Sequence, residues 1–61
     1  MPDREWISIP ELAEHLGVPV RTIRSWRARG EGPTGVVFGR AVRFHRKDVD
    51  AWIQQQRDAA A

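Results

Sequence analysis

Cysteine is absent from this 61-residue sequence, which excludes disulfides and cysteine-ligated metal sites. The two histidines, His15 and His45, lie thirty residues apart and lack the spacing of metal ligands. We therefore expect no metal and no other cofactor, and interpret His15 as a half-buried surface residue and His45 as a helix-start or surface residue. So small a domain depends on a compact apolar core, for which three tryptophans are the main resource.

Long hydrophobic runs are also missing. None approaches the roughly 18 residues that a membrane-spanning helix needs. The first residues, Met-Pro-Asp-Arg-Glu, are charged and have no apolar stretch behind them, unlike a signal peptide. These absences predict a cytoplasmic protein without a membrane partner, and the length predicts a single domain over residues 1–61.

Charge is distributed unevenly along the chain. Residues 21–47 carry eight basic side chains against one carboxylate, whereas residues 1–20 and 48–61 are acidic on balance. A basic middle between acidic flanks suggests a face for a polyanion, although composition alone fits a solvated basic surface equally well. Seven of the eight basic residues are arginines, which form planar bidentate contacts with phosphate and guanine.

A first helix is predicted over residues 9–16. Ser8 and Glu11 have the spacing of a capping box, in which each side chain bonds the backbone amide of the other. Pro10 lies in the first turn, where a missing N–H costs nothing, and Gly17 is placed to end the helix in a left-handed turn. The apolar residues that recur on one face are Ile9, Leu12, Ala13 and Leu16.

A second helix is predicted over residues 20–29, after a turn too short to hold any other element. Pro19 suits its start and Gly30 its end. The residues able to face inward at three-residue spacing are Val20, Ile23 and Trp26. Trp26 fits a core position better than a phosphate donor, although its indole N–H allows both. Two short helices joined by such a turn form a helix-turn-helix.

A β-hairpin is predicted after the loop of residues 30–35, which is rich in glycine and proline. Its strands are the β-prone runs 36–38 and 42–44, and its loop is 39–41. The side chains expected to face inward are Phe38, Val42 and Phe44. Arg43, between two inward neighbours, should point to solvent or to a ligand.

A third helix is predicted to start near residue 46 or 47, with Asp48 and Asp50 in its first turns, where carboxylates suit the helix dipole. Its apolar set is Val49, Trp52 and Ile53, of which the last two are assigned to the core. Residues 57–61 are interpreted as a fraying tail. The fold class expected is mainly α with a small β-hairpin, a winged helix-turn-helix with a two-stranded wing and a C-terminal helix.

The second helix of a helix-turn-helix docks in the major groove through its N-terminal residues. Arg21 lies at that end and is the best candidate to read guanine, a contact worth about 1–3 kcal/mol of discrimination. The neighbours able to reach a base edge or a phosphate are Thr22, Arg24 and Ser25. Arg27 and Arg29, toward the other end, are assigned to the DNA backbone or to plain surface.

The predicted wing carries Arg40 at its tip, where small neighbours let one long cation project. The negative potential of a narrow minor groove attracts such an arginine, so Arg40 is assigned to the minor groove. Arg43 is interpreted as a phosphate contact from the strand or as plain surface.

An enzyme is disfavoured, because no carboxylate pair lies beside a nucleophile and neither Ser8 nor Ser25 has a supporting His and Asp. The glycines follow neither a phosphate-loop nor a dinucleotide-binding pattern. A protein-interaction module is a further alternative, with the acidic flanks or the glutamine-bearing last helix as its surface.

The stretch ISIPELAEHLGVPVRTIRSWRARGEGPTGVVFGRAVRFHRKDVDAWI, residues 7–53, resembles the excisionase-like, MerR-type winged helix-turn-helix family. ELAEHLGV matches the first helix, RTIRSW the recognition helix, and GRAVRFHRKDVDAWI the wing and last helix. TIRSW is similar to the TVRRW of phage lambda-type excisionases, and GRAVRFH to their GREYLFH. Ser25 and Ala28 depart from that pattern, which has basic residues there, so base readout at these positions is expected to differ.

The resemblance implies sequence-specific binding to double-stranded DNA, with Arg40 on the wing tip and the major-groove residues on the second helix. Those residues are Arg21, Thr22, Arg24 and Ser25. The family includes recombination directionality factors, which bend DNA, bind beside neighbouring copies and assist an integrase. It also includes small MerR-like transcriptional regulators that bind promoters, and both uses place the protein at the nucleoid of a bacterial or phage-infected cell. The chain ends soon after Ile53, so we expect neither a dimerisation helix nor a small-molecule effector domain.

Overall fold

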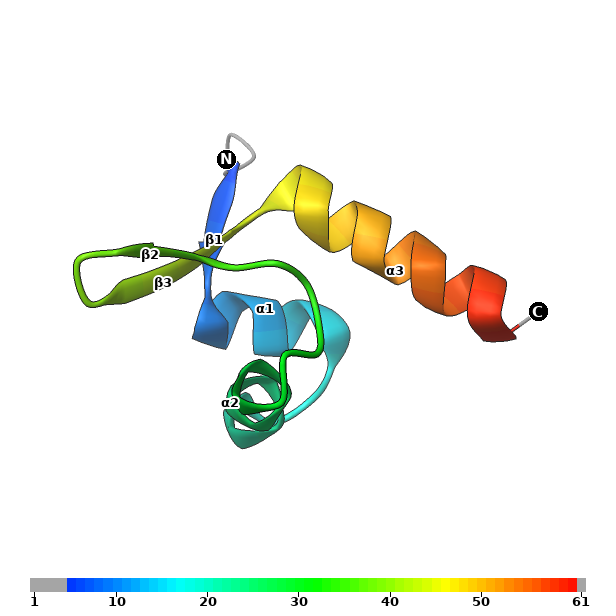
Figure 1. Cartoon of the computed structure of the whole chain (residues 1–61), viewed down its shortest axis with the longest axis horizontal. Helices are drawn as coiled ribbons and strands as arrows, with labels where there is room; N and C mark the ends of the chain where they lie inside the picture. Colours follow the sequence, from blue (N-terminus) through cyan, green and yellow to red (C-terminus); the bar gives the residue numbers. More distant parts are fainter. Residues whose placement is uncertain (1–4, 61) are drawn as a thin grey trace.

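The computed structural model describes residues 5–60 (Figure 1). The elements, in chain order, are β1 (Trp6–Ser8), α1 (Ile9–Leu16), α2 (Val20–Ala28), β2 (Val36–Phe38), β3 (Ala41–His45) and α3 (Arg46–Ala60). Helix, short turn, helix, hairpin and last helix follow one another as expected. The predicted fold class, a mainly helical winged helix-turn-helix, is confirmed.

Helix α1 has the predicted bounds because both of its ends are closed by local hydrogen bonds. The Ser8 Oγ accepts a bond from the Glu11 amide at 3.2 Å, and the Ser8 amide donates to the Glu11 Oε1 at 2.9 Å. At the other end, Gly17 has a left-handed φ of 72°, and the Val18 amide donates to the Ala13 carbonyl at 3.0 Å.

The cap at Ser8 leads to a stability prediction. Ser8→Ala is expected to lower the free energy of unfolding by about 1 kcal/mol, because the Glu11 amide loses its acceptor at the helix start. Urea denaturation followed by circular dichroism measures this loss. Ser8→Thr is the matched control, since threonine keeps the hydroxyl; equal losses in both variants would contradict the assignment to capping.

Helix α2 ends one residue earlier than predicted, at Ala28. Its end is a Schellman turn around Gly30, whose φ is 71°. The Glu31 amide donates to the Trp26 carbonyl at 2.7 Å and the Gly30 amide to the Arg27 carbonyl at 3.1 Å. The chain therefore turns back sharply after α2 before it runs into the wing.

The wing belongs to a three-stranded antiparallel sheet with the order β1-β3-β2, in place of the two-stranded hairpin expected. Strand β1 pairs with β3 through Ile7 and Phe44 and their neighbours, and the Glu5 carbonyl accepts a bond from the Arg46 amide at 2.7 Å. A three-residue strand is too short to show a period-two pattern, which is why the sequence did not predict it. Strand β1 ties the wing to the start of α1.

The turn of the wing is one residue shorter than predicted. Ala41 lies in β3, so only Gly39 and Arg40 connect the strands. Gly39 has a φ of 63°, as the first residue of a type II′ hairpin turn requires.

The register of the hairpin shows that the inward assignment of Phe38 is wrong. Phe38 pairs with Ala41, so its side chain lies on the outer face of the sheet. It is 52% exposed, and its ring meets the ring of Trp6 edge-on with centroids 5.2 Å apart. Because β2 pairs with β3 through a two-residue turn, the alternation along β2 is shifted by one residue from that expected.

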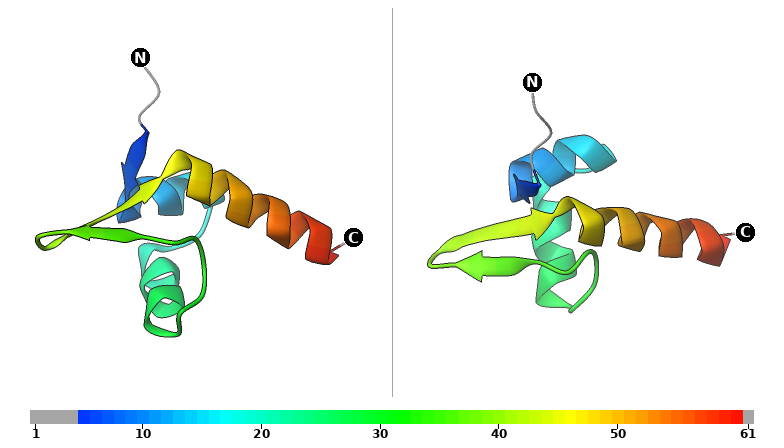
Figure 2. Two further views of the ribbon diagram at one scale, coloured as in Figure 1. Left: turned by 45° about the horizontal axis from the view of Figure 1, so that its top comes forward. Right: turned by 90° about the horizontal axis from the view of Figure 1, so that it is seen from above.

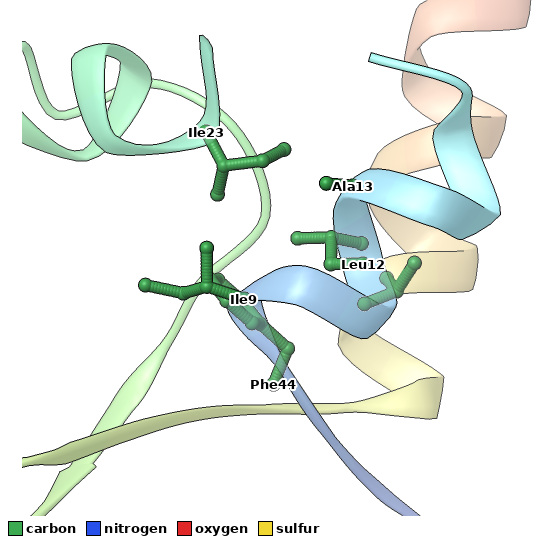
Figure 3. Close-up of a cluster of buried hydrophobic side chains, with 6 residues drawn as sticks. Ile9, Leu12, Ala13, Ile23 and Phe44 are labelled. Carbon is green, nitrogen blue, oxygen red and sulfur yellow. The ribbon is translucent and has the colours of Figure 1, made fainter. Parts of the chain in front are cut away.

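The inner face of the sheet packs on the helices. Phe44 is fully buried and Val42 is half-buried against the core, which confirms both assignments. The buried side chains of the hydrophobic core cluster come from α1, α2, β3 and α3 (Figure 3). They are Ile9, Leu12, Ala13, Ile23, Phe44 and Val49.

The tryptophans contribute less to this core than expected. Trp6 is 41% exposed on the outer face of the sheet. Trp26 is half-buried and packs against the core, as does Ile53. Trp52 is half-buried against Trp26, with ring centroids 5.3 Å apart. The centre of the core is one phenylalanine and aliphatic side chains, and the larger indole ring of Trp26 packs at its edge.

Helix α3 starts at Arg46, as predicted, and continues to Ala60, so the fraying tail expected from residue 57 is helical in the structure as far as it is described. The His45 Nδ1 accepts a bond from the Lys47 amide at 3.1 Å, which supports the assignment of His45 to the helix start. His15 is exposed, not half-buried. None of the helices in residues 5–60 is long and apolar enough to cross a membrane.

Candidate nucleic-acid interface

The exposed side of α2 is basic. Arg21, Arg24 and Ser25 are exposed there, while Ile23 on the opposite side is buried. Residues three and four positions apart lie on the same side of a helix, so the exposed residues form one continuous surface. Within residues 5–60, the side chains of Arg21 and Arg24 form no hydrogen bond and no ion pair.

The N-terminus of α2 is open. Pro19 precedes the helix and makes no side-chain cap, so the first amides of α2 keep the partial positive charge of a helix start. Thr22 lies in this first turn and is half-buried, and its own amide donates to the Pro19 carbonyl at 3.0 Å. The threonine hydroxyl is thus less accessible than the arginines on either side of it.

The C-terminal end of α2 holds the two other predicted arginines in different environments. Arg27 is half-buried, and its guanidinium lies beside Gly35, where a Cβ would come within 2.5 Å of Nη1. Arg29 is exposed and donates to the Ser25 Oγ at 2.9 Å. Its other terminal nitrogen is 3.2 Å from the Glu31 carboxylate. Arg29 therefore extends the exposed surface of α2, whereas the Arg27 side chain lies against the loop at Gly35.

The wing contributes two further arginines. Arg40 is exposed in the two-residue turn, and nothing in residues 5–60 hydrogen-bonds to its side chain. Arg43 lies on the outer face of the sheet between β1 and β2, opposite Ser8 and Val36. Its Nη1 donates to the Val42 carbonyl at 2.9 Å, and its side chain is half-buried. Arg43 thus lies on the expected face of the sheet, but its side chain is half-buried there and not extended into solvent.

The basic side chains described above lie on two separate parts of the molecule, α2 and the wing. The wing and α3 extend in opposite directions from the body, and α2 lies between them in all three views (Figures 1 and 2). Helix α1 packs against α2 on its inner side. With this arrangement a protein is able to place a helix in one groove of DNA and a second segment in the adjacent groove.

This arrangement has a counterpart among known domains. The family model described as a helix-turn-helix domain matches residues 6–57, which include all of the helices and strands except the last three residues of α3. The chain belongs to this helix-turn-helix family. The family is typical of excisionase-like DNA-binding proteins. A comparison with curated proteins found no match.

Membership in the helix-turn-helix family makes binding to double-stranded DNA the activity of this domain. In helix-turn-helix domains the second helix of the motif is the one that enters the major groove, and α2 holds that position in the chain order. No cluster of three or more metal-ligating side chains occurs within residues 5–60. Glu31 is not predicted as a site residue by any motif, and its only signal in the sequence is that it is the one carboxylate among the basic residues 21–47.

Proposed function

We propose that this helix-turn-helix domain binds a specific sequence of double-stranded DNA, with α2 in the major groove and the wing tip in the minor groove. One observation carries the proposal: Arg21 and Arg24 are exposed on one side of α2 and have no partner within residues 5–60. Arginines that are exposed and unpaired in the free protein are available to form bidentate contacts with guanine or phosphate.

Each basic side chain has its own part in this proposal. Arg21, at the open start of α2, reads a guanine through its O6 and N7 atoms. The helix residues that reach further base edges or phosphates are Thr22, Arg24 and Ser25. Arg40 enters the minor groove from the wing turn. The residues that hold the sugar–phosphate backbone are Arg27, Arg29 and Arg43.

We further propose that the protein is an excisionase-type factor, which bends DNA and assists integrase-mediated excision beside neighbouring copies of itself. The family match and the resemblance of TIRSW and GRAVRFH to excisionase motifs support this role. A wing arginine in the minor groove also suits a protein that deforms its site. A small transcriptional regulator would use the same contacts on a promoter.

Binding-site selection with purified protein, followed by footprinting, tests the DNA-binding proposal. We expect one preferred sequence. With about five phosphate contacts, we also expect log affinity to fall with log salt at a slope of about −4.5. At about 150 mM salt, equal affinity for the selected site and for random duplex would contradict specific binding. A flat salt dependence would favour a protein-interaction module instead.

The selected site then distinguishes the two uses of DNA binding. An excisionase-type factor should bend the fragment, as measured by circular-permutation gel shift, and should increase recombination by the integrase encoded beside it. A footprint over a promoter, without any effect on recombination, would assign the protein to transcriptional regulation.

A further inference from the structure

Arg29 stands apart from the other exposed arginines of α2 because its charge is already engaged. It follows the helix directly, at the four-residue spacing of Arg21 and Ser25, and so continues the surface that these two residues form. Its Nη1 donates to the Ser25 Oγ at 2.9 Å, and its Nη2 lies 3.2 Å from the Glu31 Oε1. The Glu31 carboxylate thus accepts a hydrogen bond from the guanidinium nitrogen that would otherwise be available to a phosphate.

The backbone holds Glu31 in this position. The Schellman turn at Gly30 reverses the chain, and the Glu31 amide is bound to the Trp26 carbonyl at 2.7 Å. Gly32 on the other side rests on the Trp26 ring, where a Cβ would come within 3.2 Å of the ring carbon Cε3. Glu31 is therefore fixed between two contacts to Trp26, with its carboxylate beside Arg29.

The ion pair between Arg29 and Glu31 contributes little to the stability of the fold. The side chains of Arg29 and Glu31 are 55% and 59% exposed, and exposed pairs contribute only about 0–1 kcal/mol to stability. The larger consequence concerns what Arg29 is able to bind, because a carboxylate accepts hydrogen bonds only and repels a phosphate that approaches the same guanidinium.

We propose that Glu31 competes with DNA phosphate for Arg29 and thereby lowers the affinity of the protein for DNA of arbitrary sequence. The inference rests on the proposed function, since it concerns a cation of the DNA-facing helix. To bind a phosphate, Arg29 has to leave Glu31 and bring a carboxylate close to the DNA backbone. Contacts to bases by Arg21 do not carry this cost, so binding to random duplex, which consists of phosphate contacts alone, depends on Arg29 for a larger share of its affinity than binding to the preferred site does.

The test measures binding of wild-type protein and Glu31→Gln to a random-sequence duplex over a range of salt concentrations. Glutamine keeps the size of the side chain but removes its charge, which makes Arg29 available for about one more phosphate contact. The slope of log affinity against log salt should then steepen by about 0.9. The advantage of the variant over wild type should be about 3.5-fold larger at 50 mM than at 200 mM salt, which is the same slope written as a ratio.

Asp58→Asn is the matched control. It removes one exposed carboxylate from the C-terminal part of α3, the helix that extends in the opposite direction from the wing (Figure 1). Its acceptor oxygen remains available to Gln54, to which Asp58 is bonded at 3.0 Å. The control should gain only the small, salt-screened increase that follows from one less negative charge.

Arg29→Ala, alone and combined with Glu31→Gln, isolates the pair. If Glu31 acts through Arg29, its replacement in the Arg29→Ala background should match the control, with no steeper slope. A full gain in that background would overturn the pairing and leave simple repulsion. Wild-type binding with no gain in Glu31→Gln would overturn the inference alone, whereas no binding of duplex by the wild-type chain would overturn the proposed function.

Discussion

Replacing Phe44 by alanine is expected to abolish cooperative folding of this domain at 25 °C. Phe44 is fully buried, and it pairs with Ile7 in the sheet, while its strand β3 packs against α1 and α3. Gly35 closes the other side of the ring, where a Cβ would lie 3.0 Å from it. A Phe→Ala change at such a site costs about 3–5 kcal/mol, and the whole core of so small a unit supplies about as much.

Thermal and urea denaturation followed by circular dichroism measure the effect, and Phe38→Ala is its control. Phe38 is the same residue type in the same hairpin but is 52% exposed. Its loss should cost about 1 kcal/mol, through the edge-on contact with Trp6 and the small area it buries. Equal destabilisation by the two variants would mean that the register of the wing differs from that described.

The second large effect is expected at Arg21. Arg21→Ala should weaken binding to the selected DNA site by about 1–3 kcal/mol, which corresponds to about 5- to 150-fold in Kd. Because the proposed contact is to a base, the variant should also lose its preference at one base pair. Affinity for random duplex should fall by the smaller amount that one fewer cation explains. Gel-shift titration with the selected site and its single-base variants measures all three quantities.

Two controls sharpen the result. Arg21→Lys keeps the charge but loses the bidentate fork, so it should resemble alanine on the selected site and wild type on random duplex. Arg57→Ala removes an exposed arginine near the C-terminal end of α3, and should cause only the small, salt-screened loss that follows from one fewer positive charge. If Arg21→Lys bound the selected site like wild type, Arg21 would be a phosphate contact, and base readout would have to come from Arg24 or Ser25.

The surface of α2 combines available and engaged arginines. Arg21 and Arg24 have no protein partner within the described residues, whereas Arg29 is held by Ser25 and Glu31. A helix with every arginine available would bind any duplex strongly, because phosphate contacts do not depend on sequence. Preference for one site is a difference between two affinities, and lowering the sequence-independent attraction is one way to keep binding to random duplex weak.

Much of the fold follows from short-range signals. The bounds of α1 were predicted because Ser8, Glu11 and Gly17 close the helix by bonds that span at most five residues. Helix α2 and the start of α3 are similarly encoded by local apolar spacing and by Gly30. The identity of the basic helix and of the wing-tip arginine also follows from sequence order, which is why Arg21 and Arg40 were placed on the exposed surface correctly.

Tertiary structure alone decided three features of the molecule. Strand β1 forms because Ile7 pairs with Phe44, which is far away in the sequence. A strand of three residues is too short to be predicted from a hydrophobic pattern. Phe38 faces outward because of the register of β2 on β3, which is set by a two-residue turn. The alternation of residues along the sequence does not reveal this register. The absence of cysteine settled from the outset that no disulfide holds the fold. The folded chain alone shows that Phe44 and aliphatic side chains form the centre of the core, because packing depends on distances between segments that the sequence does not measure.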